Sequence, residues 1–161
     1  MLNEFQTKLV WENMLAAETR SLYFGDLATQ YTRRKQWITG SAFFLSSGAA
    51  ATIIGKSPEW VPVVLAVIVA VATAYSMAIN LDGKIGTMAK LHASWNSIAV
   101  DYSRLWSHTY ADDAEQELDQ IVGRARESSE LATTDAPNLP KLLDKWEGYV
   151  FAMHHLTGEN G

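Results

Sequence analysis

The sequence contains no cysteine, and this absence excludes several kinds of site. Without cysteine the chain forms no disulfide framework, no thiolate metal site and no thiol nucleophile. Clustered positive charge is also scarce, because the longest basic run is Arg33 to Lys35 and the formal net charge is −5 at pH 7. Proteins that bind nucleic acid need such clusters to neutralise phosphates, so we expect no nucleic acid partner.

Charged residues are missing altogether from two neighbouring stretches. Gln36 to Gly55 comprises 20 uncharged residues, and Trp60 to Leu81 comprises 22. A helix rises about 1.5 Å per residue, so about 20 apolar residues cross a hydrocarbon core of about 30 Å. Only Lys56 to Glu59 separates the two stretches, which is enough for a tight reversal. The sequence therefore predicts a transmembrane helical hairpin with spans at residues 36–55 and 60–81.

Lysine and arginine fall mainly on one side of this predicted hairpin. The turn carries only Lys56. The basic residues near the other ends of the spans are Arg33, Arg34, Lys35, Lys84 and Lys90. Because positive charge collects on the cytoplasmic side, we expect both termini in the cytoplasm and a multi-pass protein in the cell membrane. Met1 to Phe5 contains an acid where a signal peptide would be basic, so we expect the first span to be retained.

Small and weakly polar residues form a stripe along each span when positions advance by about 100° per residue. The positions that we consider pore-lining or helix-packing are Ser41, Gly48, Thr52, Thr73, Ser76 and Asn80. The second span also carries alanine at every fourth position from Ala66 to Ala78, a spacing that lets helices approach closely. The stripes fit two alternatives: packing between helices, or the wall of a water-filled path in an oligomer.

Residues that would carry chemistry are sparse. Neither span contains a charged residue, which argues against a proton-relay transporter or a voltage sensor. The four histidines lack partners at metal-ligand spacing, and no glycine-rich phosphate-binding motif occurs. Asp112 and Asp113 with Glu115 and Glu117 form an acidic cluster that a solvated helix start explains. We expect no enzyme, no cofactor and no metal site.

The segments outside the hairpin have helical patterns, and no strand is predicted. Residues 1–35 contain no proline and one glycine. Beyond the hairpin, apolar residues alternate spacings of three and four, which is typical of a heptad seam. The members of this seam are Met88, Leu91, Trp95, Ile98, Tyr102 and Leu105. We interpret it as the seam of an oligomer, with packing on the chain's own N-terminal helix as the alternative. Gly83 and Gly86 are the positions where this helix is expected to bend.

Two further helices are predicted in the C-terminal region. A break near Thr109 to Asp112 precedes the first, because Asp112 and Glu115 form an N-terminal capping signature. Ser128 interrupts the apolar face of this helix, and Thr133 to Asn138 reads as a loop. A last helix is predicted from about Leu139 to Leu156. The expected fold is an all-α membrane protein with three parts, residues 1–35, 36–81 and 82–161.

This layout resembles the SLATT family, which comprises bacterial two-transmembrane effector domains associated with conflict systems. The matching features are Arg20, the basic cluster from Arg33 to Lys35, the two spans, and the amphipathic seam from Met88 to Leu105. The resemblance implies a membrane protein of the bacterial inner membrane that forms a pore when infection is sensed. It also implies a trigger supplied by a separate sensor protein or a nucleotide second messenger.

Two functions from different classes follow. The first is a homo-oligomeric effector that permeabilises the inner membrane in an antiphage or conflict system and is gated by its cytoplasmic helices. The alternative is a membrane-anchored helical scaffold or assembly factor that has no conducting pore. Toxicity on expression separates them, because an effector harms the cell when activated and a scaffold does not.

Overall fold

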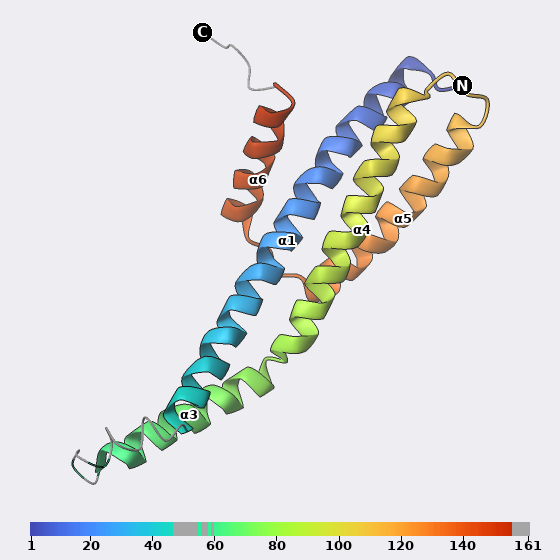
Figure 1. Cartoon of the computed structure of the whole chain (residues 1–161). Helices are drawn as coiled ribbons and strands as arrows, with labels where there is room; N and C mark the ends of the chain where they lie inside the picture. Colours follow the sequence, from blue (N-terminus) through green and yellow to red (C-terminus); the bar gives the residue numbers. More distant parts are fainter. Residues whose placement is uncertain (47–54, 56–57, 59, 156–161) are drawn as a thin grey trace. The chain divides into compact units, whose positions relative to one another are not determined.

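The computed structural model of the chain describes residues 1–46, 55, 58 and 60–155 (Figure 1). The helices are α1 (Glu4–Ser46), α3 (Trp60–Ala78), α4 (Leu81–Ser107), α5 (Ala114–Asp135) and α6 (Pro140–Met153). The described residues include no strand, which confirms the predicted all-α class. The helices group into two compact units. We call residues 1–27 with 87–161 the bundle unit, and residues 28–86 the apolar unit.

The two units combine segments that the sequence analysis treated as separate parts. The predicted N-terminal part, residues 1–35, and the C-terminal part, residues 82–161, both supply helices to the bundle unit. The apolar unit contains the predicted hairpin region, residues 36–81, and extends beyond it at both ends. The first predicted span is described only as far as Ser46, as the continuation of α1, and residues 47–54 lie outside the described part of the chain.

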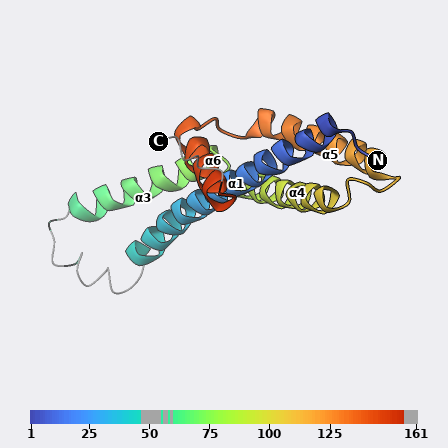
Figure 2. The same cartoon turned by 90° about the horizontal axis from the view of Figure 1, so that it is seen from above.

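The core of the bundle unit is formed by α1, α4 and α5, which run alongside one another (Figures 1 and 2). The six residues predicted as an oligomer seam are all at most 2% exposed within the single chain: Met88, Leu91, Trp95, Ile98, Tyr102 and Leu105. Val10 and Met14 from α1, and Leu118 and Ile121 from α5, are buried in the same unit. Each fully buried side chain of this kind contributes about 1.5–3 kcal/mol. The seam is therefore intramolecular core, as in the alternative of packing on the N-terminal helix, and not a surface that is open to a second copy.

Polar contacts join α4 to α5 along their length. The Oγ atoms of Ser94 and Ser128 lie 2.7 Å apart, and Ser128 is buried. This hydrogen bond explains why serine interrupts the apolar face of α5, since a buried hydroxyl needs a partner. Closer to the other end of α4, a carboxylate oxygen of Asp101 lies 2.7 Å from a guanidinium nitrogen of Arg124.

The helix starts use different caps from those expected. Asn3 and Gln6 form a reciprocal capping box at the start of α1, with hydrogen bonds of 2.8 and 2.9 Å. The predicted capping pair of Asp112 and Glu115 was wrong, because the residue before α5 is Asp113 and its side chain caps no backbone N–H. Glu115 instead accepts a hydrogen bond from the Gln6 amide at 3.2 Å, and so contacts the start of α1.

The last helix, α6, packs on α1 through polar contacts. His154 Nε2 lies 2.7 Å from a carboxylate oxygen of Glu18, and the Trp146 indole donates to Asp26 at 3.2 Å. The observed helix begins one residue later than predicted, with Pro140 in its first turn, where a missing N–H costs little. The preceding connection is shorter than predicted, because α5 continues to Asp135.

In the apolar unit, Asn80 interrupts the helix between the end of α3 and the start of α4. The sequence predicted a second span as far as Leu81 and a bend at Gly83 or Gly86, but both glycines lie inside α4. Asn80 adopts a left-handed backbone conformation, with φ at 46°. Asparagine tolerates this region better than most residues, which is why the break falls there. Its side-chain oxygen also accepts a hydrogen bond from the Gly83 N–H at 3.2 Å and so caps the start of α4.

Candidate functional site in the apolar unit

One helix among the described residues, α3, is long and apolar enough to cross a membrane. It comprises 19 residues with a mean hydropathy of 2.2. At about 1.5 Å per residue it spans close to the thickness of a hydrocarbon core. None of its residues is buried within the chain. The core helix of a water-soluble domain would be largely covered, so this exposure distinguishes α3 from such a helix.

Polar residues of α3 lie on its less exposed side. Thr73 and Ser76 are half-buried, as are Leu65 and Val69 on the same stripe, whereas the alanines at every fourth position from Ala66 to Ala78 are all exposed. The two hydroxyls, which were predicted either to line a path or to pack between helices, therefore lie on the less exposed side of α3 in the single chain. The alanine row forms the open side of the helix.

The remaining residues of the predicted stripes lie in different parts of the structure. Asn80 lies in the break after α3, where its side chain caps α4, and not in a continuous span. Ser41 lies on α1. Gly48 and Thr52 lie outside the described residues. The structure therefore brings Thr73 and Ser76 onto one face and places Ser41 and Asn80 in different surroundings.

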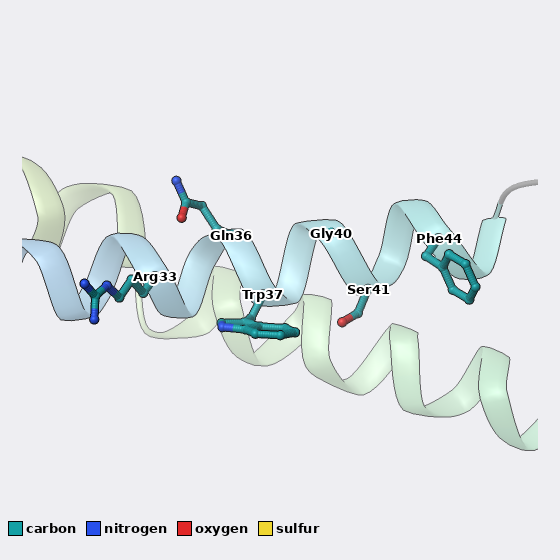
Figure 3. A pocket seen from close by; sticks show the side chains of 6 residues that line it. All are labelled: Arg33, Gln36, Trp37, Gly40, Ser41 and Phe44. Atoms are coloured by element: carbon teal, nitrogen blue, oxygen red, sulfur yellow. The ribbon is translucent and has the colours of Figure 1, made fainter.

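A groove of about 610 Å³ runs along the C-terminal part of α1 (Figure 3). Its lining residues are Arg33, Gln36, Trp37, Gly40, Ser41 and Phe44. They occupy positions i, i+3, i+4, i+7, i+8 and i+11, which share one face of a helix. In Figure 3, the Gln36 side chain points away from the ribbon of α3, and the side chains of Trp37 and Ser41 point toward that ribbon.

The groove changes in chemistry along its length. It starts with the guanidinium of Arg33, continues with the indole of Trp37, which is 77% exposed, and ends with the Phe44 ring, which is 56% exposed. Gly40 lies between the aromatic residues, and a Cβ atom built there would meet no other atom within 4 Å. The groove therefore has a cationic end, an amphipathic middle and an apolar end.

The three basic residues before the groove differ in their partners. The Lys35 ammonium lies 2.5 Å from a carboxylate oxygen of Asp82 at the start of α4. Arg33 and Arg34 are both exposed, and no carboxylate of the described residues forms an ion pair with either of them. Their charges are therefore available to a group from outside the described chain, whereas the charge of Lys35 is already neutralised.

The sequence predicted roles for some residues of this groove but did not predict that they form one groove. Arg33 was counted as a cytoplasmic charge and Ser41 as a member of a polar stripe. The signal that could have joined them is the helical spacing from Arg33 to Phe44, with aromatic residues four and eleven positions after the arginine. That spacing gives a shared face, but whether the face is open depends on how the neighbouring helix packs.

The bundle unit contains a second cavity, of about 400 Å³, in which Arg20 is the cationic residue. The Arg20 guanidinium lies 4.6 Å from the centroid of the Trp95 ring, a cation–π contact. Desolvation by burial lowers the pKa of Arg20, and the nearby Tyr102 partly offsets this effect. The Trp95 indole N–H is buried without a hydrogen-bond partner in the described part of the chain.

No group of three or more histidine, aspartate or glutamate residues in the described ranges is arranged to hold a metal ion. His92 instead contacts the backbone carbonyl of Ser21, with Nδ1 at 2.8 Å, and packs beside Gly25. Comparisons with family models, curated proteins and solved structures gave no match. The described residues define an all-α protein with a helical bundle and one helix of membrane-spanning length that has no buried residue.

Proposed function

We propose that the chain is an oligomeric membrane effector that forms a pore in, or otherwise disrupts, the bacterial inner membrane. In this proposal residues 36–55 and 60–78 form a two-span hairpin, and both termini lie in the cytoplasm. The bundle unit then gates the assembly in response to a separate sensor protein or a nucleotide second messenger. The resemblance of the sequence layout to the SLATT family favours the effector class.

The observation that carries the membrane part of this proposal is the exposure of α3. Val63, Val71 and Met77 are 63–76% exposed, although each is strongly apolar. Apolar surface in contact with water costs about 25 cal/mol per Å² of free energy. Exposure of a whole apolar helix of this length to water is therefore strongly unfavourable. Lipid tails cover such a surface without any other protein.

The proposed oligomer uses the exposed alanine row of α3. Membrane helices associate through small residues at every fourth position, because their backbones approach closely there. The row from Ala66 to Ala78 is open in the single chain, whereas the α4 seam is buried. We therefore place the contact between copies in the bilayer and not along α4.

The alternative is a membrane-anchored helical scaffold without a pore, and one observation favours it. Thr73 and Ser76 lie on the half-buried side of α3, and Asn80 caps α4. Polar groups that are used within one chain are not free to line a path. On this alternative the hairpin only holds the bundle unit at the membrane.

Topology is tested with single cysteines, which the absence of native cysteine makes clean. Gly55→Cys and Gly123→Cys are suitable, because Gly55 is exposed and a Cβ atom at Gly123 meets nothing within 4 Å. In intact cells a membrane-impermeant maleimide should label position 55 and spare position 123. Lysis should make both accessible. Labelling of both in intact cells, or of position 123 alone, would refute the proposed orientation.

Pore formation is tested by dye release from liposomes at rising protein-to-lipid ratios. An effector should release the dye above a threshold ratio, and Ala70→Trp should raise that threshold by blocking helix contact. Val71→Trp is the matched control, since it places the same side chain on a neighbouring exposed position. If the wild-type protein inserts into the liposomes but releases no dye at any ratio, the result would support the scaffold alternative over the pore.

A further inference from the structure

The groups that line the groove on α1 are complementary, in the same order, to the groups of an anionic phospholipid. Its lining runs over eleven residues from Arg33 to Phe44, which corresponds to about 16 Å along a helix axis. A phospholipid places its phosphate, its ester groups and its acyl chains at increasing depth over a comparable distance. The groove offers a cation first, then an indole and a hydroxyl, then a phenyl ring.

The cationic end can hold a phosphate. Arg33 lines the groove, is exposed, and forms no ion pair with the described residues. A guanidinium presents two parallel N–H donors to phosphate oxygens, which an ammonium does not. The adjacent Lys35 is not equivalent, because its ammonium already pairs with Asp82 at 2.5 Å.

The middle and the apolar end of the groove are suited to bind the glycerol esters and an acyl chain of the lipid. Trp37 lies one helical turn beyond Arg33, at the depth where indoles gather between headgroups and hydrocarbon. Gly40 leaves space that no described atom fills within 4 Å of its Cβ position, which admits the glycerol esters. Ser41 supplies a hydroxyl that can donate to an ester carbonyl, and Phe44 offers an apolar surface to the acyl chain.

We propose that this groove binds one anionic phospholipid of the cytoplasmic leaflet, with its phosphate on Arg33 and an acyl chain along Phe44. The headgroup is anionic because none of the described residues that line the groove is acidic, so none of them balances the ammonium that a zwitterionic headgroup would add. The proposal rests on the membrane insertion of the proposed function. It is independent of pore formation.

The experiment measures lipid binding to the delipidated full chain in a neutral detergent by native mass spectrometry. Phosphatidylglycerol and phosphatidylcholine with identical acyl chains are the probes, and inorganic phosphate is the competitor. We expect phosphatidylglycerol to bind about ten-fold more tightly than phosphatidylcholine, with millimolar phosphate displacing little of it. Equal binding of the two lipids would overturn the proposal. Efficient displacement by phosphate would show a free phosphate site instead.

Adjacent arginines provide a matched pair of variants. Arg33→Gln should reduce phosphatidylglycerol binding about ten-fold, whereas Arg34→Gln, which removes the same charge beside the groove, should reduce it less than about three-fold. Equal losses would show a diffuse surface attraction and overturn the proposal. Arg33→Lys keeps the charge and should restore part of the binding.

Gly40→Leu tests the groove without changing charge. The added side chain fills the open space at Gly40 and should weaken the binding of both lipids. Gly86→Leu, at another open glycine of the apolar unit, should leave lipid binding unchanged. Lipid binding to Gly40→Leu at the wild-type level would contradict the proposed position of the lipid in the groove. Circular dichroism checks the fold of each variant, and alkaline extraction of membranes checks insertion. Inserted protein without lipid preference refutes this inference alone, and failure to insert refutes the proposed function.

Discussion

The side-chain oxygen of Asn80 lies 3.2 Å from the backbone nitrogen of Gly83, and this hydrogen bond closes the break between α3 and α4. The contact is close enough that a Cβ atom at Gly83 would come within 2.4 Å of the Asn80 amide nitrogen. Asn80 also holds φ at 46°, a conformation that costs most residues about 1–2 kcal/mol. The pair therefore depends on both residue types.

Replacement of Asn80 tests whether this residue acts through the break or through a pore. Asn80→Leu should lower the free energy of unfolding by about 1–3 kcal/mol, because it loses the cap and strains the backbone. Asn80→Gly should cost only a few tenths of a kcal/mol, since glycine adopts positive φ freely. Thermal melts followed by circular dichroism measure both changes. If Asn80→Leu matched the wild type in stability but lost dye release, the side chain would line a path.

Charges placed in the α4 seam should unfold the bundle unit and not merely dissociate an oligomer. Ile98 and Leu105 are at most 1% exposed within the single chain. The double variant Ile98→Asp with Leu105→Asp buries two carboxylates without partners, at a cost above about 4 kcal/mol. We expect loss of helix content, measured by circular dichroism together with particle size.

Val100→Asp is the control for this change, because Val100 lies on the same helix and is 59% exposed. It should leave both the helix content and the particle size unchanged. Folded monomers of the double variant would reverse the assignment, because they would show that the seam joins separate copies.

The alanine row of α3 should control association in the bilayer. Ala70→Trp should reduce oligomer size in detergent, because the indole prevents close approach of neighbouring helices. Val71→Trp should leave the size close to that of the wild type, since position 71 lies off the row. Chemical crosslinking in membranes gives the measurement. Unchanged crosslinking by Ala70→Trp would exclude this row as the contact.

Tyr102 should make stability fall at high pH. Desolvation by burial raises its pKa above the usual 10.0, and the charges of Arg20 and Arg124 only partly offset this effect. Above pH 10 the unfolded chain releases the phenolic proton while the folded chain keeps it, so unfolding becomes favoured as the pH rises. The contribution of Tyr102 is therefore complete below pH 10 and is lost above it.

The variant Tyr102→Phe should weaken this fall without adding charge. Denaturant unfolding of both proteins between pH 8 and about 11 measures the slopes. Parallel slopes would show that the phenol titrates alike in the folded and unfolded chains. The result also bears on the core, since Tyr102 is 2% exposed in the bundle unit.

The sequence predicted the helices of the bundle unit well, but it did not predict what they pack against. Periodic apolar residues identify a buried face, and the same face satisfies a second copy or another part of the same chain. The six seam residues therefore looked like an oligomer contact until the N-terminal helix was placed beside them. Ser128 was noticed as an interruption, but only the structure shows Ser94 opposite it.

Local details were harder to predict where neighbouring residues have similar chemistry. Asp112 and Asp113 are both acceptable before a helix, and the path of the chain decides that Asp113 occupies the position. Glycine is the usual residue at a bend, yet the break falls on Asn80 because its side chain can also cap α4. The residues from Arg33 to Phe44 share one face of α1 by their spacing, but only the structure shows that this face is open.

The Ser94–Ser128 hydrogen bond has a mechanical consequence for the bundle unit. A slip of α5 by one helical turn would separate the Ser94 and Ser128 hydroxyls, and the buried Ser128 hydroxyl left without a partner would cost about 1–3 kcal/mol. The ion pair between Asp101 and Arg124 would break in the same movement. The two contacts are satisfied together in one register, so they fix how far α5 is shifted along α4.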